Sequence, residues 1–161
     1  MYDLIIRGAT VIDGLGNPAI AADVAIKDER VVEIGDLGNG AAKGAGQTID
    51  ADGLTLAPGF VDVHTHFDAQ LTWDTTASPS PSLGTTTVVM GNCGFGIAPC
   101  PPHLHETMMG NLSVVEGMDL NALRAGIDWD FETFPEYMES LRRRGTYPNA
   151  AVFIGHSAVR T

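Results

Sequence analysis

The sequence has little positive charge, only two cysteines and no long apolar run. Nine lysines and arginines against 20 aspartates and glutamates give a formal net charge of −11, which repels nucleic acid and anionic membranes. No stretch approaches the ~18 apolar residues of a membrane span, and the first residues lack the basic and apolar regions of a signal peptide. Cys93 and Cys100 are too few for a disulfide scaffold. We therefore expect a cytoplasmic protein that binds neither nucleic acid nor membrane.

The composition is that of a globular protein. Hydrophobic residues make up 44% of the 161 positions and charged residues 18%, which is far from the composition of a disordered chain. This length can form one domain with a real core, or one domain with a small appendage.

The first part of the chain has the pattern of short strands. Alternating residues in 2–13 predict two strands that are broken at Gly8, and residues 24–26 and 31–34 predict a pair around a turn at 28–30. The glycine-rich stretch 35–46 is predicted to be a loop. Residues 49–57 follow, with Asp52-Gly53 as a hairpin turn. We expect residues 1–57 to form a small all-β module.

The pattern changes to alternating strands and helices after Pro58. Apolar, β-branched runs predict buried strands that begin at Phe60 and end near His64, at 85–90 and at 150–154. Thr133 and Glu136 form a capping box at the start of a helix that ends before Gly145. The arginines 142–144 are predicted to lie at a solvated helix end, in preference to a binding patch. Residues 120–127 favour a further short helix, and the alternation indicates a parallel sheet.

Candidate metal ligands follow two of these strands. Because side chains alternate along a strand, His64 and His66 point to the same side. Cys93 lies between Gly91 and Gly94 after the second strand, and zinc favours imidazole and thiolate donors. The alternatives are a chance histidine pair in a polar loop and a cysteine that is simply part of the core.

Other polar residues near the strand ends allow more than one interpretation. Asp68 could orient a ligand or act as a base, but a turn former is the more ordinary role. His156 follows the third strand and could contact a substrate or be a core histidine. Cys100, in a proline-rich loop, is predicted to be structural.

The sequence resembles the amidohydrolase superfamily, through its D-L-I-I-R-G-A-T-V-I-D-G opening and A-P-G-F-V-D-V-H-T-H. The segments T-T-T-V-V-M-G-N-C-G-F-G-I-A-P-C and G-H-S-A-V-R are similar to the D-aminoacylase branch, the N-acyl-D-amino-acid deacylases. The resemblance implies an α/β fold with a metal-dependent (β/α)8 hydrolase barrel beside a small β-sandwich. It also implies Zn2+ binding by His64, His66 and Cys93. His156 and Arg160 belong to the G-H-S-A-V-R segment, and we predict that they bind substrate.

The implied barrel would be incomplete in 161 residues. A (β/α)8 barrel takes ~250 residues, whereas residues 58–161 can supply roughly its first three βα units. The remaining family ligands and the catalytic aspartate would lie beyond Thr161. We expect the whole enzyme to hydrolyse the amide bond of N-acyl-D-amino acids, a small-molecule substrate, and the chain alone to be inactive and to self-associate through unpaired strand edges. The alternatives are a cyclic-amide hydrolase, a deaminase or a non-catalytic truncated or binding module.

Overall fold

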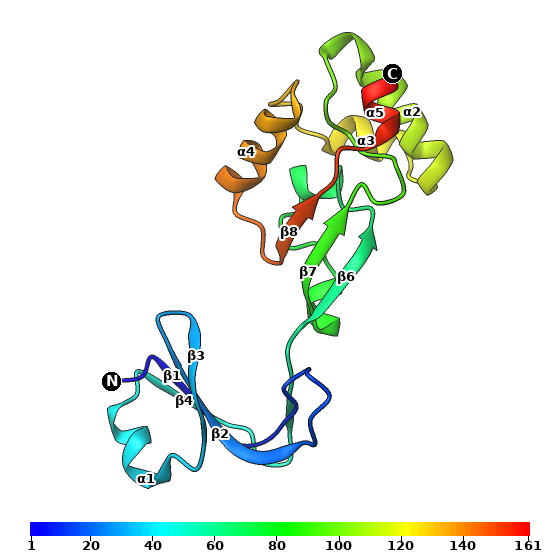
Figure 1. The fold of residues 1–161 in the computed structure, drawn as a ribbon. Coiled ribbons are helices and arrows are strands. Elements are labelled where there is room, and N and C mark those ends of the chain that lie inside the picture. Colours follow the sequence, from blue (N-terminus) through cyan, green and yellow to red (C-terminus); the bar gives the residue numbers. More distant parts are fainter. The chain divides into compact units, whose positions relative to one another are not determined.

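The computed structural model describes residues 1–161, except for the side chains of Asn39 and Ala42. The chain divides into two compact units, Met1–Pro58 and Gly59–Thr161, whose elements are drawn in Figure 1. No helix in the described part of the chain is both long and apolar enough to cross a bilayer.

The first unit is a five-stranded sheet. Its strands are β1 (Leu4–Val11), β2 (Ile20–Lys27), β3 (Arg30–Gly35), β4 (Gln47–Asp50) and β5 (Thr55–Leu56). The order is β3-β2-β1-β4, and β5 also pairs with β1. Asp28 and Glu29 both have positive φ, which gives the tight two-residue turn that the right-handed twist of a β-hairpin favours. The buried core cluster of this unit consists of Ala9, Val11, Ala22, Val24 and Ala51.

The prediction that Gly8 breaks the first strand is wrong. Gly8 has φ of +70° and lies where the register between β1 and β2 shifts, so it forms a bulge inside one continuous strand. The Asp23 carboxylate accepts a hydrogen bond from the Gly8 N–H at 2.9 Å. Because this bond satisfies the backbone donor that the bulge displaces, the strand continues past the glycine.

The predicted hairpin at Asp52-Gly53 is also wrong. The chain does turn there, and the Leu54 N–H donates to the Ala51 carbonyl at 2.9 Å. However, β4 and β5 do not pair with each other, because each runs parallel to β1. The glycine-rich stretch 35–46 contains the short helix α1 (Gly38–Ala41) and the 3-10 turn η1 (Ala42–Gly44) where a loop was predicted. The Asp36 carboxylate accepts a hydrogen bond from the Gly38 N–H at 2.9 Å, which favours the start of α1 at this position.

The second unit is a mixed α/β structure. Strands β6 (Phe60–Thr65), β7 (Thr85–Met90) and β8 (Asn149–Val152) form a parallel sheet in the order β6-β7-β8. The helices are α2 (His105–Glu116), α3 (Leu120–Gly126), α4 (Phe134–Arg144) and α5 (His156–Arg160). Short 3-10 turns are η2 (Gln70–Thr72), η3 (Ser80–Leu83) and η4 (Pro102–Leu104). The core includes Leu71, Met90, Met108, Leu112, Leu123 and Tyr137.

Helix α4 begins and ends as the sequence predicts. The Thr133 side chain accepts a hydrogen bond from the Glu136 N–H, while the Glu136 carboxylate accepts one from the Thr133 N–H. The arginines at its end differ from the prediction. Arg142 is exposed, but the Arg144 side chain is only 21% exposed and donates to the Thr72 carbonyl at 2.8 Å. The prediction of a solvated end is therefore wrong for Arg144, which ties α4 to η2.

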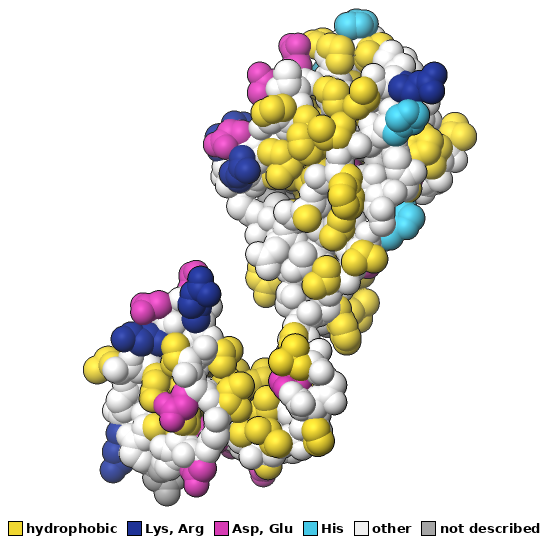
Figure 2. Space-filling view, viewed as in Figure 1, with side chains coloured by type: hydrophobic (Ala, Val, Ile, Leu, Met, Phe, Trp, Pro, Cys, Tyr) yellow, Lys and Arg dark blue, Asp and Glu magenta, His cyan; other side chains and the backbone are white. Residues whose placement is uncertain are grey.

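Strand β6 is not buried as predicted. Phe60, Val61 and Val63 are 69%, 58% and 60% exposed, and β6 is the edge strand of a three-stranded sheet. Hydrophobic side chains gather over the strands of this unit in Figure 2. The exposed apolar residues on and beside this sheet are Phe60, Val61, Val63, Leu83, Tyr147, Phe153 and Ile154.

Candidate metal centre

The carboxyl end of β6 places two imidazoles on one side of the sheet. His64 lies in the strand and His66 one residue beyond it, with ring centroids 5.2 Å apart. Between them, Thr65 is buried and donates a hydrogen bond to the Val89 carbonyl at 3.0 Å. This bond holds the end of β6 against β7 and so fixes the direction of both histidines.

The loop after β7 carries Cys93 and is held on two sides. Asn92 donates a side-chain hydrogen bond to the Val63 carbonyl on β6 at 2.9 Å. Gly91 has φ of +78°, and a Cβ on it would lie 2.3 Å from the Phe153 carbonyl oxygen. Only glycine allows the loop to pass this close to the backbone that follows β8. The Phe95 N–H donates to the Cys93 sulfur at 3.3 Å and orients it.

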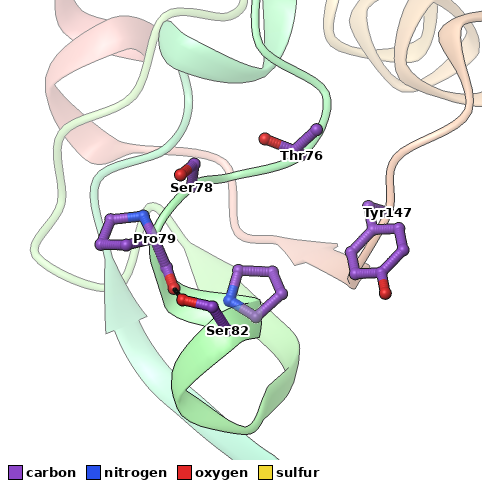
Figure 3. Close-up of a pocket in the computed structure, with 6 residues that line it drawn as sticks. Thr76, Ser78, Pro79, Ser82 and Tyr147 are labelled. Carbon is purple, nitrogen blue, oxygen red and sulfur yellow. Dashed lines mark hydrogen bonds between the residues drawn. The ribbon is translucent and has the colours of Figure 1, made fainter.

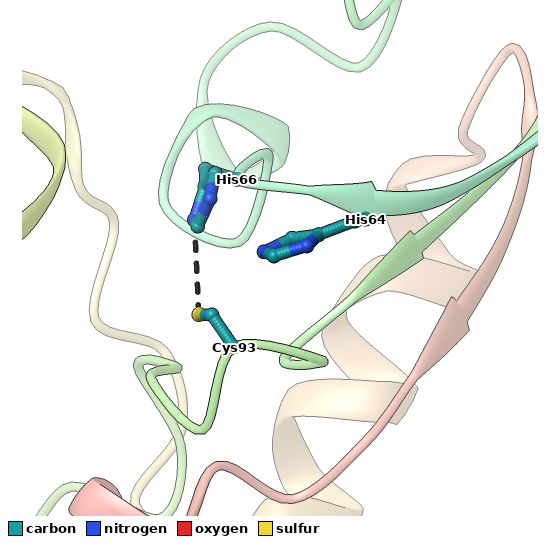
Figure 4. Close-up of side chains that lie close together, drawn as sticks. All are labelled: His64, His66 and Cys93. Carbon is teal, nitrogen blue, oxygen red and sulfur yellow. Dashed lines mark hydrogen bonds between the residues drawn. The ribbon is translucent and has the colours of Figure 1, made fainter.

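The three side chains point toward one another, as Figure 4 shows. One donor atom from each of His64, His66 and Cys93 lies within 4.8 Å of the others. The sulfur of Cys93 is 3.9 Å from Nδ1 of His66. Ligand atoms on tetrahedral zinc are about 3.5 Å apart, given zinc–ligand bonds of ~2.0–2.3 Å. Two imidazoles and a thiol at these separations can reach a common zinc ion once the side chains rotate, with either ring nitrogen of His66 as the donor atom.

Two buried carboxyl groups lie beside His66. An oxygen of the Glu116 carboxyl group lies within hydrogen-bond distance of Nδ1 of His66, at 2.8 Å, and the Glu116 side chain is 5% exposed. Burial raises the pKa of Glu116, and His66 partly opposes that rise. Asp68 is 3% exposed, and burial raises its pKa to about 7. The charge of Glu116 adds to this shift, while its own backbone N–H and His66 act against it. Two acids in this position favour a cation nearby.

Sequence reasoning undervalued Asp68 and missed Glu116. Asp68 does lie in a turn, but its burial two residues after His66 sets it apart from an ordinary turn former. Its carbonyl accepts a hydrogen bond from the buried Tyr137 hydroxyl at 2.9 Å. Glu116 is 50 residues from His66, and no local pattern connects them.

The other predicted residues lie outside this group of donor atoms. His156 and Arg160 are the exposed first and last residues of α5, and their role in substrate binding stays a prediction. The start of α5 is next to the Cys93 loop, because the Ser157 N–H donates to the Gly94 carbonyl at 2.9 Å. Cys100 is fully buried in the core, and burial raises its pKa to about 11.

A shallow cavity of about 200 Å³ lies away from the histidines (Figure 3). Its walls come from residues that precede β7 and β8 in the chain, at the opposite ends of the strands from Cys93. The lining residues are Thr76, Ser78, Pro79, Pro81, Ser82 and Tyr147. The cavity has no histidine, cysteine or carboxylate, so it offers no comparable chemistry.

Comparison with known proteins then decides the family. Residues 47–161 match the profile described as the amidohydrolase family. The chain belongs to the amidohydrolase family. It is 38% identical over 159 residues to a D-aminoacylase of Alcaligenes xylosoxydans xylosoxydans, a match that covers 99% of this chain and 30% of the relative. The resemblance to the D-aminoacylase branch is therefore confirmed.

Solved structures place this amidohydrolase in the same group. A crystal structure of D-aminoacylase matches with a TM-score of 0.78 and 37% identity over 99% of this chain and 31% of that one. An N-acyl-D-glutamate deacylase from Bordetella bronchiseptica, solved with zinc and a phosphonate inhibitor, matches with a TM-score of 0.74 and 33% identity, over 99% and 30% of the two chains. This amidohydrolase chain thus spans about a third of the length of the relatives it matches.

Proposed function

We propose that the whole protein hydrolyses the amide bond of N-acyl-D-amino acids and that zinc is its metal. The convergence of His64, His66 and Cys93 at the carboxyl ends of two neighbouring strands carries this proposal. In parallel α/β folds, and above all in (β/α)8 barrels, active sites form at that edge. The relatives support the substrate class, because they are D-aminoacylases and a D-glutamate deacylase, one of them solved with zinc.

The residues of this chain hold and orient the metal. His64, His66 and Cys93 supply donor atoms, and the buried carboxyl groups of Asp68 and Glu116 favour positive charge beside them. When bound, zinc acts as a Lewis acid toward the amide carbonyl and lowers the pKa of the water that it binds toward neutrality. Hydrolysis also needs a general acid that protonates the departing amine, and we assign that role to an aspartate beyond Thr161. Residues 1–161 alone are accordingly proposed to be inactive.

The test uses protein expressed from the complete gene, stripped with a chelator and reloaded with Zn2+. N-acetyl-D-amino acids with aliphatic and acidic side chains are compared with their L enantiomers and with hydantoin, a cyclic amide. Released primary amine is measured for the linear substrates and ring opening for hydantoin. We expect hydrolysis of the D substrates that chelation abolishes and zinc restores. Turnover of hydantoin alone, or full activity without metal, would contradict the proposal.

Cys93→Ala tests the ligand role with a matched control in the same chain. We expect this variant to bind less zinc per protein, because the site loses a sulfur donor. Cys100→Ala removes the other cysteine, which is buried in the core, and should keep the zinc content of the wild type. Zinc is quantified by atomic emission after desalting. Wild-type zinc content and activity in Cys93→Ala would exclude Cys93 as a ligand.

A further inference from the structure

Glu116 reaches His66 from a distant part of the chain. It is the last residue of α2, and Gly117, with φ of +67°, ends the helix directly after it. Its Oε1 lies 2.8 Å from Nδ1 of His66. Among the described residues, His66 is the only hydrogen-bond or ion-pair partner of the Glu116 side chain.

The helix dipole, the loss of hydration and a neighbouring carboxyl group all make this position unfavourable for a negative charge. Negative charge at the carboxyl end of a helix opposes the helix dipole. The side chain is 5% exposed, so a charge there loses most of its hydration. The buried carboxyl group of Asp68 is close enough to interact with it electrostatically and adds repulsion. Among the described residues, the contact with His66 is the one hydrogen bond or ion pair of this side chain that offsets these costs.

This contact decides which nitrogen of His66 is free. A neutral imidazole has one N–H and one lone pair, and a carboxylate can only accept. A hydrogen bond to Glu116 therefore places the proton on Nδ1 and leaves the lone pair on Nε2. The Cys93 sulfur also faces Nδ1, but at 3.9 Å against 2.8 Å for Glu116, so the carboxylate has the stronger hold on that atom.

We propose that Glu116 is a positioning residue that keeps His66 in the Nδ1–H tautomer and presents Nε2 to the metal. The inference rests on the proposed zinc centre and adds to it a residue that neither histidine spacing nor strand position indicates. Carboxylates that accept from the second nitrogen of a ligating histidine typically raise metal affinity 10- to 100-fold. Glu116 does so here from the end of α2.

The first experiment determines the tautomer of His66 without metal. Protein from the complete gene is labelled with 15N-histidine, and its ring nitrogens are observed by NMR at a pH well above the ordinary histidine pKa of ~6.5. The His66 signals are assigned by their loss in His66→Gln. We expect an Nδ1–H tautomer in the wild type and in Glu116→Gln, whose amide oxygen still accepts. Glu116→Ala should lose that preference.

The second experiment measures zinc affinity by competition with a chromophoric chelator. We expect Glu116→Ala to bind Zn2+ 10- to 100-fold more weakly and Glu116→Gln to stay within about tenfold of the wild type. Glu106→Ala is the control, because Glu106 is an exposed residue of the same helix that pairs with Arg124; it should match the wild type. If Glu116→Ala does not fold, as judged by circular dichroism, the tautomer of the wild type still tests the proposal, because a His66 that carries its proton on Nε2 would overturn it.

Each outcome bears on one proposal or on both. An unchanged tautomer and zinc affinity in Glu116→Ala overturn the positioning role. A Glu116→Gln variant that keeps the tautomer but loses zinc as severely as Glu116→Ala also overturns it, because the carboxylate would then be a direct ligand. Zinc binding without hydrolysis by the wild type overturns only the proposed function. Absence of zinc binding by the wild type overturns both.

Discussion

The two cysteines occupy opposite environments. Cys100 is fully buried, and burial raises the pKa of its thiol to about 11. At pH 8 only about one Cys100 in a thousand would be the thiolate, which is the form that reacts. Cys93 is partly exposed on its loop beside the two histidines. Residue position, and not residue type, therefore decides reactivity in this chain.

We predict that iodoacetamide at pH 8 modifies Cys93 and leaves Cys100 free. Zinc should slow the modification, because a metal-bound sulfur is withdrawn from the reaction. Peptide mass spectrometry after timed labelling measures both sites in one sample, and a urea-unfolded sample shows that Cys100 can react when exposed. Equal labelling rates at the two cysteines in the folded protein would refute the contrast.

At the scale of elements, Arg144 joins helix α4 to the turn that follows β6. Its guanidinium donates to the Thr72 carbonyl at 2.8 Å, to the Ser140 hydroxyl at 3.0 Å and to Asp128 at 2.6 Å. Its side chain is 21% exposed, so the bonds are partly shielded from water. Loss of this arginine leaves several acceptors without their partner.

We predict that Arg144→Met lowers the free energy of unfolding by about 1–3 kcal/mol. Arg142→Met is the matched control, because Arg142 is 68% exposed and has one long contact with Glu139 at 3.5 Å; its effect should stay within about 0.5 kcal/mol. Urea denaturation followed by circular dichroism compares the two. Equal effects would mean that the contacts of Arg144 add nothing to stability.

The capping box of α4 gives a prediction about pH. Hydrogen bonds from the backbone of Thr133 and Glu132, and then from the Thr133 side chain, hold the pKa of Glu136 below its usual value. The unfolded chain then binds the proton more readily than the folded one, so this contribution to stability is present above the ordinary Glu pKa of ~4.3. It is lost as the pH falls through the lower, folded pKa.

We therefore expect Glu136→Gln to make the free energy of unfolding less dependent on pH between about 3 and 5. Glu139→Gln, in the same helix but outside the capping box, is the control and should leave that dependence close to the wild type. Urea denaturation at closely spaced pH values measures the slope. A steeper slope in Glu136→Gln would contradict the assignment.

Local chemistry explains which elements could be predicted. The capping box predicted α4, and apolar β-branched runs predicted β6 and β7, because these patterns act within a few residues. The sequence pattern did not predict helix α2, because Gly110 and the two consecutive valines Val114 and Val115 are poor helix formers. The hairpin at Asp52-Gly53 failed because turn residues do not choose the pairing partner, and here both strands pair with β1.

The same limit applies to the candidate site. Period-two alternation puts His64 and His66 on one side of a strand, and the structure brings Cys93 within 4.8 Å of them. The glycines around Cys93 indicated a constrained loop, but its approach to β6 depends on Asn92 and on the backbone at Phe153. Glu116 depends on a helix that the sequence pattern did not predict. Contacts between distant segments, and not local propensities, complete the site.

At the scale of the whole molecule, the sheet of the second unit exposes apolar side chains to solvent. Phe60, Val61 and Val63 are each more than half exposed on the edge strand β6, and Phe153 and Ile154 are exposed just after β8. An apolar edge strand with unpaired backbone groups is a template for association. A (β/α)8 barrel would cover such edges with further strands, and the relatives are about three times as long as this chain.

We predict that a polypeptide of residues 1–161 self-associates and that Val61→Thr/Val63→Thr weakens the association at least several-fold. Threonine keeps the β propensity of valine while it replaces an apolar methyl group with a hydroxyl, so the strand persists but its surface becomes less apolar. Val114→Thr is the control, because Val114 is 86% exposed and lies on helix α2, outside the strands of the sheet. Sedimentation velocity over a range of concentrations measures the effect. A cooperatively folded monomer at every concentration would contradict the prediction, and would show that residues 1–161 are stable without further strands beside the three-stranded sheet.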